Sequence, residues 1–240
     1  MRNRSIVVIV EIAAVMLFFG CSKPDSQASS AGASDPTENL PAKYKVSEEV
    51  KKSDFSEAAK SPEFQQAIKD ASVLLVAPPK PLISLGERLE VPGGVSFEVP
   101  SRNIEGILRE AHQKFFEKGF YLFRYEQNFG LADRLDLVGL LPTTDKYAVM
   151  AAMETNGDNY NIGTSGVIAW MKDMEKDHAY VLTGIGFDYM EGHLIPPVKD
   201  AKSLAERMYE FCPDIVDQGV GDKDKLVAEL EKGKLYFWWD

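Results

Sequence analysis

The sequence predicts a single α+β domain in which a mixed β-sheet is flanked by helices. Two observations carry this prediction. Apolar residues recur at strand spacing in some segments and at helix spacing in others, and the two kinds of segment intermix without the strict alternation of a parallel α/β fold. The chain has 240 residues, of which 45% are hydrophobic and 10% aromatic, so it has ample material for one core.

Four regions are expected along the chain. Residues 1–20 have the pattern of an export signal. Residues 21–42 are rich in Ser, Ala, Pro and Asp and predict a flexible tether. Residues 43–72 predict a helical extension punctuated by Pro62. The α+β domain is then expected over residues 73–240.

Within that domain, hydrophobic spacing and turn residues predict the elements in order. Short apolar runs or strands are expected at residues 73–76, 89–91, 95–99, 120–125, 135–141, 179–183, 186–190 and 235–240, with turns at Gly93-Gly94 and Glu191-Gly192. Helices are expected at residues 102–118 and 146–154 and after the N-caps Thr164, Asp200 and Asp222. Gly119 and Gly233 follow two of these helices and are typical helix ends.

Cys21 is the residue of the N-terminal region with the most specific prediction. The apolar run at residues 6–19 is shorter than the roughly 20 residues of a membrane span, and Glu11 interrupts it. Residues 17–21 resemble the lipobox of bacterial lipoproteins, in which the signal peptidase cuts before a Cys whose sulfur carries lipid. We therefore expect a cell-envelope protein held to the membrane through lipid on Cys21. An ordinary signal peptide with a chance Cys is the alternative.

The residue after the cysteine bears on the destination. Ser22, rather than Asp, follows Cys21. This resembles the sorting pattern for the outer membrane, if the host has one.

Composition excludes several classes of function. The net charge is −10 and no basic patch appears, so we expect no nucleic-acid partner. With Cys21 acylated, Cys212 has no disulfide partner and is expected to be a buried thiol. No cofactor or metal site is predicted, because dinucleotide, phosphate-loop and zinc-ligand spacings are missing. The three histidines are expected on the surface or in packing: His112, His178 and His193.

Several motifs in the C-terminal half occur in a distinctive order. They are Thr155-Asn156-Gly157 with Asn159-Tyr160, Ile168-Ala169-Trp170, Leu182 to Asp188, Met208 to Val216 with Gln218-Gly219, and Leu235-Tyr236-Phe237-Trp238-Trp239-Asp240. Over about residues 136–240 this order resembles the bacterial domain-of-unknown-function family numbered 4253. The resemblance implies no activity, cofactor or partner.

Five polar residues are candidates for binding. Asn156, Asn159 and Tyr160 belong to the most polar loop of the domain, which suits ligand recognition, although turn chemistry explains the same residue types. Asp188 and Asp214 are carboxylates in apolar surroundings and could converge with Asn156 on one pocket. Strand-end and cap roles are the alternative for both.

These features predict a binding or interaction module whose acidic, amide-rich face meets an envelope protein or another envelope ligand. The alternative prediction is a hydrolase that uses Asp188 and Asp214 as acid and base, with or without a divalent metal ion.

Overall fold

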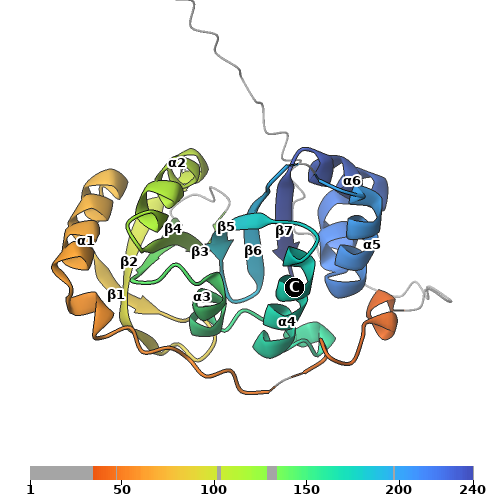
Figure 1. The fold of residues 1–240 in the computed structure, drawn as a ribbon, viewed down its shortest axis with the longest axis horizontal. Coiled ribbons are helices and arrows are strands. Elements are labelled where there is room, and N and C mark those ends of the chain that lie inside the picture. Colours follow the sequence, from red (N-terminus) through yellow and green to blue (C-terminus); the bar gives the residue numbers. More distant parts are fainter. Residues whose placement is uncertain (1–34, 47, 102–103, 129–133, 197, 240) are drawn as a thin grey trace, which may run out of the picture. The chain divides into compact units, whose positions relative to one another are not determined.

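A mixed sheet of seven strands runs through the described part of the chain, in the order β1-β2-β4-β3-β5-β6-β7 (Figure 1). Neighbouring strands pair antiparallel except β3 and β5, which pair parallel. The predicted α+β class with a mixed sheet is therefore confirmed. The strands are β1 (Lys80–Ile83), β2 (Glu90–Pro100), β3 (Tyr121–Glu126), β4 (Leu135–Leu141), β5 (Tyr180–Ile185), β6 (Tyr189–Leu194) and β7 (Lys234–Trp238).

This computed structural model describes residues 35–46, 48–101, 104–128, 134–196 and 198–239. The predicted signal, Cys21 and residues 22–34 of the predicted tether lie outside the described residues. So does Asp240, the last residue of the predicted aromatic strand.

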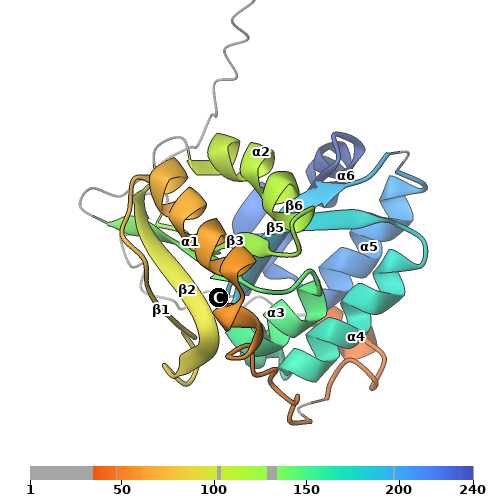
Figure 2. The ribbon, with the colours of Figure 1, turned by 60° about the vertical axis from the view of Figure 1, so that its left-hand side comes forward.

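Helices cover both faces of the sheet (Figures 1 and 2). On one face, α1 and α2 bury an apolar cluster against β2, β3 and β4. On the other face, α3, α4, α5 and α6 share a larger cluster with β3, β5, β6 and β7. The helices are α1 (Pro62–Leu75), α2 (Ile104–Phe116), α3 (Lys146–Met153), α4 (Thr164–Glu175), α5 (Ala201–Phe211) and α6 (Lys223–Glu231).

Two of the three predicted N-caps agree with the structure. The prediction for Thr164 is wrong, because Thr164 is the first residue of α4 and Gly163 occupies the N-cap position. The Asp200 carboxylate accepts a hydrogen bond from the amide of Ser203, and Asp222 does the same for Lys225, so both are N-caps as expected. Gly119 and Gly233 have φ of +92° and +80°, a conformation that costs glycine little.

The N-terminal segment differs from its prediction. Among the described residues of 43–61 there is no α-helix. Ser61 accepts a hydrogen bond from the amide of Phe64 and Pro62 occupies the first helical position, so α1 begins there. The run at residues 73–76 is the end of this helix and does not open the domain. Residues 35–42 are packed as well, since Leu40 belongs to the larger apolar cluster.

Two predicted turns lie inside strands. Gly93 and Gly94 are part of β2, and a Cβ on Gly94 would come within 2.8 Å of the Leu82 side chain. Gly192 is part of β6, and a Cβ there would lie 2.0 Å from the carbonyl oxygen of Val181. Gly94 and Gly192 therefore allow neighbouring strands to approach closely. The turn before β6 instead falls at residues 186–188.

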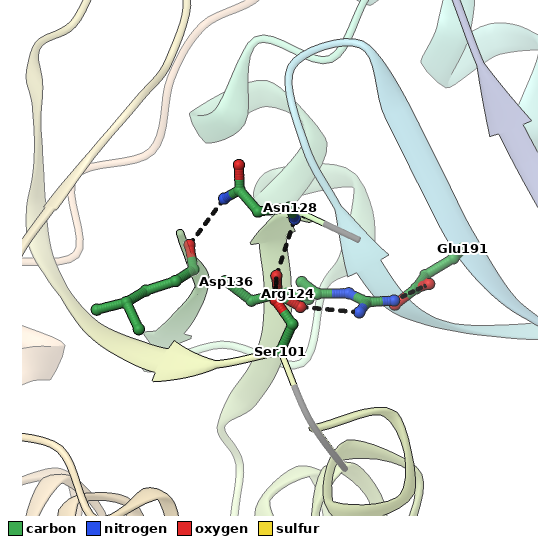
Figure 3. A network of polar contacts seen from close by, with 6 residues as sticks. Ser101, Arg124, Asn128, Asp136 and Glu191 are labelled. Carbon is green, nitrogen blue, oxygen red and sulfur yellow. Dashed lines mark hydrogen bonds and ion pairs between the residues drawn. The ribbon is translucent and has the colours of Figure 1, made fainter. Parts of the chain in front are cut away.

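Charged side chains join the two halves of the sheet on the face that carries α1 and α2 (Figure 3). The guanidinium of Arg124, on β3, donates two hydrogen bonds to the carboxylate of Glu191, on β6. Its third bond goes to Asp136 on β4, at 3.1 Å. The other oxygen of Asp136 accepts from Ser101 Oγ at 2.5 Å and from the backbone amide of Asn128 at 2.8 Å. We call Arg124, Asp136 and Glu191 the clasp.

The side chains of the clasp pass over β5 at Gly184. Arg124 and Gly184 are register partners in the parallel pairing of β3 with β5. A Cβ on Gly184 would lie 2.3 Å from Cγ of Glu191, so a side chain there would push Glu191 away from Arg124. Tyr121 ties the same two strands by donating its hydroxyl proton to the carbonyl of Leu182, at 3.0 Å.

Gly184→Ala should lower the free energy of unfolding by about 1–3 kcal/mol, because the added methyl group overpacks the clasp. Combined with Glu191→Ala, the same change should cost much less, since the obstructed side chain is then missing. Urea denaturation of both single variants and the double variant measures the coupling.

Gly106→Ala is the matched control. A Cβ added to Gly106, in α2, would meet no packing partner within 4 Å among the residues that the structure describes, so alanine should stabilise the helix by about 0.5–1 kcal/mol. Equal stability of Gly184→Ala and the wild type would contradict the close approach.

Candidate functional site

Four segments with the distinctive motifs meet at one end of the sheet. They are residues 155–160 after α3, residues 186–188 between β5 and β6, residues 211–214 at the end of α5, and residues 238–239 at the end of β7. We call these four segments the signature corner. Motifs that are far apart in the sequence therefore lie close together in the folded chain.

Main-chain hydrogen bonds hold the corner together. The amide of Asn156 donates to the carbonyl of Phe187 at 2.8 Å, and the amide of Trp239 donates to the carbonyl of Asp188 at 2.9 Å. Thr155, which is fully buried, donates its hydroxyl proton to the carbonyl of Gly186 at 2.6 Å. The two loops that carry Asn156 and Asp188 are thus fixed to each other and to the end of β7.

The indole ring of Trp239 explains why a glycine follows Asn156. A Cβ on Gly157 would lie 2.7 Å from Cδ1 and from Nε1 of this ring, so only glycine fits. Trp239 is 3% exposed and packs edge-on against Phe211, with ring centroids 5.4 Å apart. The polar loop at residues 155–160 therefore packs against the buried indole ring of Trp239.

Asp214 is the buried carboxylate of the corner, with 3% exposure. Its Oδ1 accepts hydrogen bonds from the hydroxyl of Tyr160 at 2.7 Å and from Nε2 of Gln218 at 2.9 Å. Burial raises the pKa of Tyr160, and the neighbouring carboxylate raises it further, so Tyr160 keeps its proton and acts as a donor. Asp214 begins an unusual stretch, because residues 215–220 form a π-helix, a rare element often found at functional sites.

The structure brings the five predicted residues into one corner in different ways. Tyr160 and Asp214 meet through their side chains. Asn156 and Asp188 belong to loops that meet through main-chain bonds. Asn156 also uses its own side chain locally, donating to Glu154 O and accepting from the amide of Asp158, which is turn chemistry. Asn159 and Asp188 are solvent-exposed, whereas Asn156 and Tyr160 are half-buried.

Cys212 has the buried environment expected for it. Its side chain is fully buried and its thiol donates to the carbonyl of Trp238 at 3.0 Å. Burial raises the pKa of this thiol strongly, which opposes thiolate formation. Within the described ranges, no three His, Cys, Asp or Glu side chains are grouped so that they could hold a metal ion.

The clasp lies outside the predicted set of site residues. So does a cavity beside α2 that includes His112 and Tyr147. Arg124 could have been noticed, because it occupies an inward position in the apolar strand predicted at residues 120–125. Its partners Asp136 and Glu191 are 12 and 67 residues away, and no local pattern connects them.

Tyr160→Phe should destabilise the protein by about 1–2 kcal/mol, because the buried carboxylate of Asp214 loses a hydrogen-bond donor. Chemical denaturation measures the change. Tyr209→Phe is the control: its hydroxyl donates at 3.2 Å to Asp217, which is exposed, so the cost should stay below about 0.5 kcal/mol. Equal effects of the two substitutions would argue against a special role for the Tyr160 contact.

Comparison with known proteins agrees with the resemblance seen in the motifs. Residues 137–240 match the model of DUF4253, a domain of unknown function. No curated protein and no solved structure matches the chain. The matched segment includes most of β4, all of β5 to β7 and all four segments of the signature corner. The resemblance to the DUF4253 family is therefore confirmed for the C-terminal part of the chain, residues 137–240.

Proposed function

We propose that the chain is a binding or interaction module and that its ligand contacts the signature corner. The observation that carries this proposal is the way the corner is built. Main-chain bonds and a buried tyrosine–carboxylate pair hold the loops, while Asp158, Asn159 and Asp188 are exposed. A fixed scaffold that presents polar side chains loses little conformational entropy when it binds.

The charge of the corner favours a partner rich in hydrogen-bond donors or positive charge. Asp158 and Asp188 are the exposed carboxylates, and the whole chain carries a net charge of −10. Complementary charge across an interface steers association and suppresses wrong partners. A basic surface of an envelope protein is the partner that we propose.

A hydrolase using Asp188 and Asp214 is the second candidate. The observation in its favour is that both residues belong to the same corner, in loops that contact Trp238 and Trp239. Against it, Oδ1 of Asp214 already accepts two hydrogen bonds from protein groups, which suits a supporting role. We therefore rank binding first.

We further propose that the module is held in the cell envelope by lipid on Cys21, in the outer membrane if the host has one. The support is the short charged and apolar leader that ends at Gly20-Cys21. Among the helices described, none is long and apolar enough to cross a membrane.

Reversing the charge of the corner should abolish partner capture. Tagged wild-type protein, crosslinked in cell envelopes and purified, should recover a partner that the Asp158→Lys/Asp188→Lys variant recovers at least about tenfold less, because like charges then face each other. Quantitative mass spectrometry of the eluates measures the ratio.

Glu231→Lys is the control for this experiment. Glu231 is exposed at the end of α6, just before β7 begins, whereas the corner lies where β7 ends. Its reversal should leave capture unchanged. If no partner exceeds background, or if the corner variant recovers it as well as the wild type, the proposed interface is wrong.

Cys21→Ser should remove the lipid anchor. The variant should appear in the soluble fraction or persist as the unprocessed precursor, because serine offers no thiol for acylation. Metabolic labelling with palmitate and fractionation of membranes are the measurements. Failure of labelled palmitate to enter the wild-type chain would refute the anchor, while leaving the corner experiment unaffected.

A further inference from the structure

A cavity of about 240 Å³ opens at the far end of β5 from the signature corner. Tyr180 and Val181 begin β5 and line the cavity, whereas residues 186–188 of the corner follow the end of the same strand. Residues from α2, β3, the loop before α3, α3 itself and the end of α4 complete the lining: His112, Gln113, Phe116, Tyr121, Thr144, Asp145, Lys146, Tyr147 and Glu175.

The tyrosine protons of the cavity are already donated to protein groups. Tyr121 donates to the carbonyl of Leu182 at 3.0 Å, and Tyr180 donates to that of Met171 at 3.2 Å. Tyr147 donates to a carboxylate oxygen of Glu175. These hydroxyls are therefore fixed in place, and their remaining lone pairs are acceptors.

The lysine of the cavity, Lys146, also has partners within the protein. Lys146 forms an ion pair with Glu175, and its Nζ lies 3.9 Å from the centre of the Tyr180 ring. Its charge is offset by one carboxylate, and Asp145 adds a second. With a neutral imidazole at His112, the lining has a net charge of −1.

His112 has one ring nitrogen left for a ligand. The residue is 3% exposed, and Nδ1 lies 2.9 Å from the carbonyl oxygen of Leu122. Because a carbonyl only accepts, Nδ1 carries the proton. Burial lowers the pKa of His112, so the ring is neutral at pH 7 and Nε2 is an acceptor. Nε2 has no hydrogen-bond partner among the residues that the structure describes.

We propose that this cavity binds a small organic ammonium ion. An ammonium group has three donors and no acceptor, and it matches a lining that includes His112, whose Nε2 is an acceptor, and the carboxylates of Asp145 and Glu175. The half-exposed ring of Phe116 and the side chain of Val181 offer an apolar surface for the hydrocarbon part. The volume lies below the roughly 300–1,000 Å³ of sites for drug-sized ligands, which limits the ligand to a few carbon atoms.

Titration with n-butylammonium, followed by two-dimensional NMR of the isotope-labelled chain, tests the proposal. n-Butanol, which has the same carbon chain and no charge, is the control ligand. We expect saturable shifts of the backbone amides around the cavity with butylammonium and none with butanol at the same concentration. Shifts confined to other surfaces, or equal shifts with butanol, would overturn the proposal.

Asp145→Asn removes one negative charge from the lining and leaves a residue that also caps helices well. It should raise the dissociation constant for butylammonium about two- to fivefold. Asp222→Asn makes the same substitution at the N-cap of α6 and should leave binding unchanged. An unchanged dissociation constant in Asp145→Asn would also overturn the proposal. The cavity is separate from the corner, so either result leaves the proposed interface untouched.

Discussion

The bidentate pairing of Arg124 with Glu191 is the contact on which the sheet depends. Among the described residues, the parallel ladder between β3 and β5 pairs Arg124 with Gly184 alone, so the regular backbone pairing is short where the two halves of the sheet join. The clasp spans that junction from β4 to β6. Burial raises the pKa of Glu191 and Arg124 opposes the shift, because desolvation disfavours the charged carboxylate and the neighbouring guanidinium favours it. Such a buried network is weak evidence for stability, but removing one partner from it is strongly destabilising. We therefore interpret the clasp as a set of contacts that specifies which strands are neighbours where β3 joins β5.

The clasp also explains how the family segment relates to the fold. Residues 137–240 include most of β4 and all of β5, β6 and β7, but β3 lies between β4 and β5 in the sheet. The matched segment therefore has a gap in its own sheet that residues from outside it must fill. Arg124 and most of the clasp come from the part of the chain that the family model does not match, whereas Glu191 comes from the matched part. The structural domain is consequently larger than the family segment, and it begins before β3.

Local patterns predicted the elements whose determinants are local. The amphipathic helices were found because their apolar faces repeat at helix spacing, and their ends were found because Asp200, Asp222 and Gly233 act on neighbouring amides or backbone angles. The turn predicted at Glu191-Gly192 is wrong, because a glycine in a turn and a glycine against a neighbouring strand look alike in sequence. Tyr160 and Asp214 were both candidates, but their contact spans 54 residues and no local pattern predicts it. The cavity was missed for the same reason, since its lining comes from segments as distant as His112 and Val181.

Strand β5 connects the two regions for which we propose ligands, the cavity beside α2 and the signature corner. Its first residues, Tyr180 and Val181, line the cavity, and the residues after its end belong to the signature corner. Gly184, over which Glu191 reaches Arg124, lies between them. A substitution in the clasp would therefore move the strand that both sites share, and it would disturb them together whichever of them binds a ligand. Asp145, Asp158 and Asp188 lie outside β5, and Asp158 and Asp188 are exposed, so substitutions there are expected to change β5 less than substitutions in the clasp. If a substitution at Asp145, Asp158 or Asp188 weakens binding at one site alone, the substituted residue belongs to that binding site. If a substitution weakens binding at both sites, the cause is a displacement of β5.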